Sequence, residues 1–271
     1  LVAWLRHFFC ATAKLPMVTT DAVCFMLDRV FDNWCNEAAL LLGAPRSGQA
    51  RPAPRGGSTF PAEPDQLEPD TGATATEIDS VAAEFVHAGP FFVLNLAHGN
   101  PIIVETNTLQ ADEEGGHYRP APIFRSVERW VTAAPGKQVD VPPERRAQIR
   151  DRLLGVLLSQ SADILDRGIG DAADLDLGCC IALGFKRGPL DLMKSLGDAE
   201  CTRISERFVR ERPGMPAPRR AWAAYPSALR HVLVDEMRGV KIITLRRPEA
   251  LNALHDEMTD EILGVIRRHE H

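Results

Sequence analysis

The chain has 271 residues and a formal net charge of −6 at pH 7, with 45% hydrophobic and 25% charged residues. These values are typical of a globular protein with room for two or three modest domains. The acidic balance gives no electrostatic reason to expect nucleic acid as a partner, and no apolar run is long enough to suggest a membrane span. The cysteines show no Cys-x-x-Cys spacing, so we expect free core thiols and a reducing, cytoplasmic location. They are Cys10, Cys24, Cys35, Cys179, Cys180 and Cys201.

The first part of the chain is predicted to be helical around one long interruption. Apolar residues at helical spacing predict a helix over 1–13, and 15–18 is expected to follow as a short strand, as at the end of an α/β domain. A long amphipathic helix is predicted over 21–42. Residues 43–72 are rich in proline and glycine, which predicts a solvated insert without regular structure.

Two Gly-Pro pairs mark equivalent helices in the middle of the chain. Glycine followed by proline is typical of a helix start, and the pairs are Gly89-Pro90 and Gly188-Pro189. Thr74 to Glu77 matches a capping box and predicts a helix before the first pair. A long helix from Pro142-Pro143 and a shorter one from Asp171 are predicted before the second pair. This shared order predicts two copies of one helical unit.

The C-terminal part has a different pattern. Prolines between 213 and 229 predict an interdomain linker. Two β-prone runs, 231–236 and 240–245, flank Arg238-Gly239 and predict a hairpin. A final helix is predicted from about Asp256. We expect a fragment at both ends, since the chain starts at Leu1 without methionine and stops within a helical pattern.

Several motifs resemble the helical C-terminal domain of 3-hydroxyacyl-CoA dehydrogenases. The first unit carries Lys14-Leu15-Pro16-Met17-Val18, Cys24-Phe25-Met26-Leu27-Asp28-Arg29, Asn36-Glu37-Ala38, Ile78-Asp79 and the Gly89-Pro90 helix. The second carries, more clearly, Leu175-Asp176 and Leu183-Gly184-Phe185-Lys186-Arg187-Gly188-Pro189-Leu190-Asp191-Leu192. The larger fused enzymes of this family hold the domain in tandem.

The tail from His231 resembles the opening of a crotonase-type enoyl-CoA hydratase domain. Its motif is Val240-Lys241-Ile242-Ile243-Thr244-Leu245-Arg246-Arg247-Pro248-Glu249-Ala250-Leu251-Asn252-Ala253-Leu254. The resemblances together imply a mainly α fold, with two tandem dehydrogenase-type helical units and a truncated α/β crotonase-type segment. The expected domains are the tail of a dinucleotide-binding domain at 1–16, the first helical unit at 17–126, the second at 127–212, a linker at 213–229 and the hydratase segment at 230–271.

The function that these resemblances imply is fatty-acid β-oxidation. A bifunctional parent enzyme would oxidise 3-hydroxyacyl-CoA to 3-oxoacyl-CoA with NAD and would also carry an enoyl-CoA hydratase. NAD would be bound mainly by a domain preceding Leu1, so the isolated chain is expected to be inactive. The expected partners are an acyl-CoA substrate and a second copy of the chain, joined through the helical units. Two alternatives stay open: a hydratase parent with a degenerate dehydrogenase half, and a non-catalytic helical dimerisation module.

The resemblance also implies site residues. Asp28 stands where the family has a substrate-contacting asparagine, and Asp151 holds the like position in the second unit. Ionised aspartate only accepts hydrogen bonds, so a substrate carbonyl would lose its donor unless Asp28 is protonated. Cys24 stands where the family usually has glycine. In the hydratase segment, Ala250, Asn252 and Ala253 belong to the loop that would help to hold CoA.

Three other patterns resemble functional sites, but a structural explanation is simpler for each. His98 and Glu105 have helical spacing, but Gly99 and Pro101 should break the helix between them. Gly168-Ile169-Gly170 follows a helix and lacks the third glycine of a dinucleotide loop. Glu257 and Glu261 are expected on a solvated helix face. The sequence predicts no metal ligands.

Overall fold

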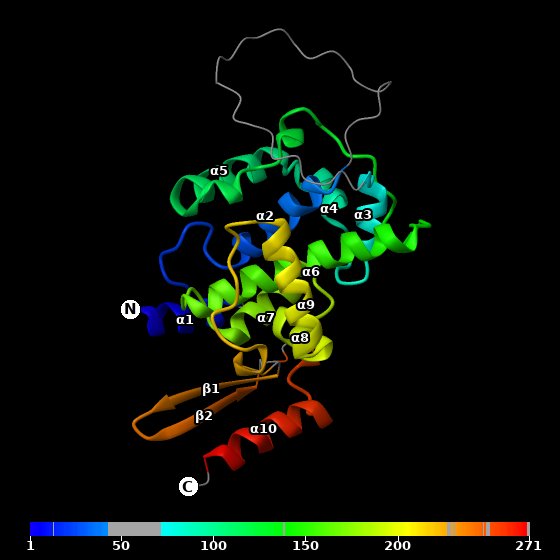
Figure 1. Cartoon of the computed structure of the whole chain (residues 1–271). Coiled ribbons are helices and arrows are strands. Elements are labelled where there is room, and N and C mark those ends of the chain that lie inside the picture. Colours follow the sequence, from blue (N-terminus) through cyan, green and yellow to red (C-terminus); the bar gives the residue numbers. More distant parts are fainter. Residues whose placement is uncertain are drawn as a thin grey trace.

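A computed structural model describes residues 1–12, 14–42, 72–137, 139–226, 229, 231–245, 247 and 250–269. The fold is mainly helical, as the sequence predicts (Figure 1). The helices are α1 Val2–Ala11, α2 Leu27–Leu40, α3 Ala75–Ala82, α4 Pro90–Ala97, α5 Asn100–Glu114, α6 Pro143–Asp166, α7 Ala172–Ile181, α8 Pro189–Leu196, α9 Asp198–Glu211 and α10 Asp256–Arg268. Strands β1 Val232–Met237 and β2 Val240–Leu245 form a two-stranded sheet.

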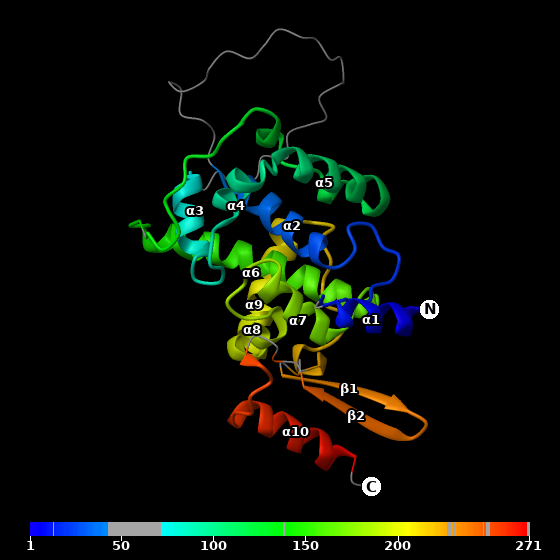
Figure 2. The same cartoon turned by 180° about the vertical axis from the view of Figure 1, so that it is seen from behind.

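Helices α2 and α6 pack against each other at the centre of the helical part. In both views α3, α4 and α5 lie on one side of this pair and α7 and α8 on the other, while α9 packs against α6 (Figures 1 and 2). A single apolar cluster extends from Met26 to Tyr225 and includes Trp34, Leu154 and Phe208. The boundary predicted near residue 126 therefore separates two sequence units that share one core.

The two Gly-Pro helices begin with the same device, and the predicted helix starts are confirmed. Asp79 on α3 accepts hydrogen bonds from the first free amides of α4, those of Phe91 and Phe92, at 3.0 and 2.9 Å. Asp176 on α7 does the same for Leu190 and Asp191 of α8, at 2.6 and 3.2 Å. Amides at a helix start lack partners within the helix, so each aspartate completes the helix that follows it.

The loops that precede these helices pair with each other across the molecule. Val86 and Phe185 form an antiparallel bridge. The amide of His87 donates to the carbonyl oxygen of Gly184 at 2.9 Å, and the amide of Lys186 donates to that of Phe85 at 2.8 Å. Val86 lies three residues before Gly89 and Phe185 three before Gly188. Equivalent positions of the two units therefore meet, which places an approximate twofold axis at this bridge.

Two N-terminal predictions are wrong in detail. Residues 15–18 form no strand, because no described segment pairs with them. Helix α2 begins at Leu27 instead of residue 21. The reason is local: Cys24 and Phe25 have φ values of 60° and 46°, in the left-handed region that a right-handed helix excludes.

Residues 213–226 pack onto the helical core instead of forming a free linker. The Ser159 hydroxyl donates to the Pro216 carbonyl oxygen at 2.7 Å, and the Tyr225 hydroxyl donates to Asp166 Oδ2 at 2.7 Å. Trp222 is also buried. The insert predicted over 43–72 lies outside the described residues, apart from Gly72.

The C-terminal hairpin and α10 are confirmed. Strands β1 and β2 are antiparallel, with Met237 opposite Val240. Arg238 and Gly239 have φ values of 54° and 79°, as a two-residue turn between twisted strands requires. Helix α10 packs on β1 over a small second apolar cluster around Met258. Among the described residues, every helix is too short or too polar to traverse a lipid bilayer.

Candidate functional site

Asp28 lies in the first turn of α2 and is exposed. Its carboxyl group forms no hydrogen bond or ion pair with another described residue. Partial burial raises its pKa above the ordinary value, which favours the protonated form relative to a free aspartate. Asp28 is thus an acid on the surface whose hydrogen-bonding capacity is not used by the described part of the chain.

The turn before Asp28 holds an unusual backbone. Two consecutive residues with side chains, Cys24 and Phe25, adopt positive φ, a conformation that costs about 1–3 kcal/mol for each non-glycine residue. Glycine would adopt this conformation at position 24 without the strain that a side chain causes. Cys24 Sγ donates to the Thr106 carbonyl oxygen on α5 at 3.5 Å. Burial and the nearby Asp32 raise the pKa of Cys24 to about 11, so it is a thiol and not a nucleophilic thiolate.

Asp32 lies one helical turn after Asp28 and was missed by sequence reasoning. It is 3% exposed, and its Oδ2 has no hydrogen-bond partner. Burial raises the pKa of Asp32 to about 7, against the lowering effect of the Thr106 hydroxyl. The only signal in the sequence was the spacing of four residues, which puts both carboxyl groups on one helix face. The start of α2 therefore holds two acids of different exposure and raised pKa.

Asp151, at the position of the second unit that corresponds to Asp28, has a structural role. Asp151 Oδ2 accepts from Arg203 Nη1 at 2.7 Å and from Arg207 Nη1 at 2.9 Å. These hydrogen bonds lower the pKa of Asp151 although burial acts to raise it. Asp151 is therefore an ionised structural residue that ties α6 to α9.

The first unit lacks both arginines. Buried Arg29 binds Glu114 at the end of α5, while Arg152 binds Glu211 at the end of α9. Arg203 and Arg207 lie eight and four residues before Glu211, and the residues at the same distances before Glu114 are Thr106 and Gln110. Neither side chain is charged, so Asp28 has no ionic partner equivalent to those of Asp151.

A network of buried polar side chains connects the first half of α2 to α5. Asn33 Nδ2 donates to Gln110 Oε1 at 2.9 Å, and Asn107 Nδ2 donates to Asn33 Oδ1 at 3.1 Å. Gln110 in turn donates to Glu114 at 3.1 Å. Asn33, Asn107 and Gln110 are all fully buried or nearly so. These bonds fix α5 against α2 and hold the two acids in place.

Replacement of Asp32 by asparagine is expected to change the pH dependence of stability. The pKa of Asp32 is about 7 in the folded chain and about 3.9 in the unfolded chain, so its folded form is stabilised at low pH. That contribution is present below about pH 4 and is lost as the pH rises through 7. Asp32→Asn should therefore match the natural chain near pH 4 and exceed it by roughly 4 kcal/mol at most near pH 8.

Urea unfolding at the two pH values measures this difference. Asp28→Asn is the matched control and should show a smaller dependence, because Asp28 is more exposed to water. Equal stability of Asp32→Asn and the natural chain at high pH would show that folding does not raise the pKa of Asp32.

The predicted CoA loop is a compact turn. Asn252 Oδ1 accepts from the Arg247 amide at 2.7 Å, and Arg247 Nη1 donates to the Ala253 carbonyl oxygen at 3.1 Å. The Ala250 amide donates to the Arg247 carbonyl oxygen at 3.1 Å. Leu251 and Asn252 have φ values of 52° and 57°. Asn252 therefore shapes the loop, while Asn252 and Ala253 stay exposed and far in sequence from the α2 site.

The other sequence patterns that resemble sites behave mostly as predicted. His98 ends α4 with a φ of 49°, so Glu105 lies on a separate helix. Gly168 ends α6 with a φ of 64°, and no strand precedes it. Glu261 differs from the prediction of a solvated face, because its Oε2 accepts from the His231 amide at 2.8 Å.

No family model matches the chain.

Proposed function

We propose that the chain is the helical part of a bifunctional β-oxidation enzyme that oxidises 3-hydroxyacyl-CoA to 3-oxoacyl-CoA, followed by the start of an enoyl-CoA hydratase domain. The observation that carries the proposal is the unpaired Asp28 in the first unit, at the family's substrate-contacting position, beside the fully paired Asp151 in the second. The duplicated aspartate-capped Gly-Pro helices add support, because the fused enzymes of this family carry the helical domain in tandem. The expected compartment is the cytoplasm.

In this proposal Asp28 binds the oxygen of the substrate. A protonated carboxyl group can donate to a carbonyl oxygen, as an asparagine amide would, and burial shifts Asp28 toward that form. Protonated Asp32 adds no negative charge beside Asp28, and its raised pKa of about 7 favours the protonated form. The polar network between α2 and α5 keeps both groups in position.

In this proposal the Gly168-Ile169-Gly170 segment does not hold NAD. The Gly168-Ile169-Gly170 segment follows α6 instead of a strand. A Cβ atom added at Gly170 would lie 2.4 Å from Met26 Sδ, so this glycine serves close packing. In the proposed parent enzyme NAD accepts the hydride, and this chain contributes the wall that orients the acyl substrate.

Substitution of Asp28 by asparagine tests the proposal. The amide restores a permanent donor, so we expect acetoacetyl-CoA to bind about threefold to tenfold more tightly, equivalent to one net hydrogen bond. Isothermal titration calorimetry on the full chain measures the affinity. Hydrogen exchange of the amides around Cys24 and Thr106 reports where the ligand lies.

Asp151→Asn is the matched control at the equivalent position. It should lower the melting temperature, because two arginines lose an ionised partner, and leave the affinity for acetoacetyl-CoA unchanged. Equal effects of the two substitutions on affinity would contradict a special role of Asp28. No binding of acetoacetyl-CoA by any variant would favour the non-catalytic dimerisation module.

One observation favours a second candidate, a hydratase parent with a degenerate dehydrogenase half. Cys24 adopts a strained φ of 60° where the family usually has glycine, and Asp28 replaces asparagine one helical turn before the buried Asp32. Loss of both family residues is what drift at an unused site would produce. In that case Asp28→Asn and Cys24→Gly would leave acyl-CoA binding unchanged and affect stability alone.

A further inference from the structure

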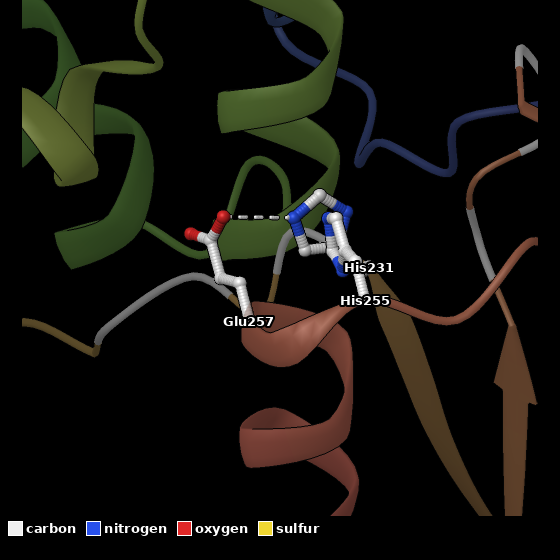
Figure 3. A group of neighbouring side chains, drawn as sticks. All are labelled: His231, His255 and Glu257. Atoms are coloured by element: carbon white, nitrogen blue, oxygen red, sulfur yellow. Dashed lines mark hydrogen bonds and ion pairs between the residues drawn. The ribbon is translucent and has the colours of Figure 1, made fainter.

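His231, His255 and Glu257 converge at the junction of β1 and α10, outside the site at α2 (Figure 3). One ligand atom from each side chain lies within 4.8 Å of the others. His231 directly precedes β1, His255 is the N-cap of α10, and Glu257 lies in the first turn of α10. No local pattern predicts this cluster, because His231 and His255 are too far apart for a recognised ligand spacing.

Two kinds of contact hold these side chains together. Val232 and Met258, which are fully buried, pack the start of β1 on the start of α10. The His231 amide donates to Glu261 Oε2 at 2.8 Å, which fixes the backbone of the first ligand. His231 itself is 12% exposed in its side chain, whereas Glu257 is 57% exposed. The cluster thus has a rigid, sheltered histidine and an accessible carboxylate.

The distance between the ligand atoms of His231 and Glu257 suits a tetrahedral metal ion. His231 Nε2 and Glu257 Oε2 are 3.3 Å apart. Neighbouring ligand atoms lie about 3.3–3.6 Å apart when metal bonds of about 2.0–2.2 Å point to the corners of a tetrahedron. The His231 and His255 rings are 4.5 Å apart between centroids and nearly perpendicular, at 83°. A small movement of His255 would complete three corners.

We propose that His231, His255 and Glu257 form a binding site for a borderline divalent ion of the zinc class, with a fourth position open. Two imidazoles and one carboxylate are a donor set that zinc accepts, and three protein ligands leave room for water or a small ligand. Glu257 also lines an open pocket of about 570 Å³ between α8 and α10. The fourth position therefore has space beside it.

Local charge supports a cation here in spite of the helix dipole. The start of α10 is positive through its free amides. Four acidic residues on its first two turns oppose that field: Asp256, Glu257, Asp260 and Glu261. Lys194, Arg267 and Arg268 also line the pocket and suit an anionic fourth ligand.

Metal binding is linked to the capping of α10. His255 Nδ1 accepts from the Met258 amide at 3.0 Å, so neutral His255 carries its proton on Nε2. An ion bound at Nε2 requires the other neutral tautomer, with the ring proton on Nδ1, so the proton moves from one ring nitrogen to the other and none is released. In that tautomer Nδ1 no longer accepts from Met258, so metal binding at Nε2 removes this cap from α10.

Titration of the full chain with Co²⁺ alone tests the site, because tetrahedral Co²⁺ absorbs visible light strongly and octahedral Co²⁺ weakly. We expect one equivalent to bind with a tetrahedral spectrum and to be displaced by Zn²⁺. Glu257→Gln changes an exposed, isosteric side chain and should weaken binding by more than about 100-fold, the upper end of the effect of losing only a supporting contact.

His255→Asn is the matched variant, since asparagine caps helices well and removes only the imidazole. It should weaken binding as much as Glu257→Gln, with circular dichroism unchanged. Absence of a tetrahedral spectrum, or binding that survives both substitutions, would overturn the site. An intense near-ultraviolet thiolate band would do the same, by assigning the ion to cysteine.

Discussion

Replacement of Arg29 by alanine is expected to lower the free energy of unfolding by about 3 kcal/mol. The Arg29 side chain is 0% exposed and donates to both oxygens of Glu114, at 2.8 and 2.6 Å. It also reaches Asp163 Oδ2 at 3.3 Å. Its removal leaves two acids without their buried cation, and chemical denaturation of the full chain measures the loss.

The loss should lie at the lower end of the range for broken buried ion pairs, because Arg167 still contacts both acids. Burial would raise the pKa of Glu114, but hydrogen bonds from Arg29, Arg167 and Gln110 lower it to about 2. Arg167→Ala is the matched control, since Arg167 is 33% exposed and should cost less than about 1 kcal/mol. Equal losses in the two variants would show that burial does not decide the strength of this network.

Replacement of Gly188 by alanine should be comparably harmful, at about 3 kcal/mol. Gly188 has a φ of −65°, which any residue adopts, so its backbone needs no glycine. The need is steric: an added Cβ would lie 2.2 Å from Asp176 Cγ. Alanine would push Asp176 away from the amides of α8, and thermal or urea unfolding measures the effect.

Gly264→Ala provides the matched control on α10. An added Cβ at Gly264 meets nothing within 4 Å, so alanine should be neutral or stabilising by up to about 1 kcal/mol. Asp176→Ala in the Gly188→Ala background should cost little more than Gly188→Ala alone, because the cap is already displaced. Additive losses would mean that the glycine and the aspartate act independently.

Much of the helical fold could be predicted, because the signals that start and end its elements are local. The Thr74 capping box, the Gly-Pro starts and the Arg238-Gly239 turn depend on a few adjacent residues, and the structure confirms them. The strand at 15–18 could not be judged in this way, because a strand exists only with a partner. The apolar stripes on α2 and α6 likewise did not tell which faces would join into one core.

The site was predictable only in part. Asp28 was found through resemblance, but its lack of a partner depends on Thr106 and Gln110, which are distant in sequence. Asp32 was hidden because its raised pKa is a consequence of burial that no local pattern reveals. The contact between His231 and His255 was hidden as well. His231 precedes the hairpin and His255 follows the loop after it, so only the fold brings the two rings together.

The bridge between Val86 and Phe185 has a consequence for assembly. Its two hydrogen bonds join equivalent residues, so exchanging the units leaves the contact unchanged. That is the property of an isologous interface between identical subunits. A single unit with either loop would present the same self-complementary edge to a copy of itself. Within this chain the duplicated unit already occupies that edge, so any further pairing of whole chains must use a different surface.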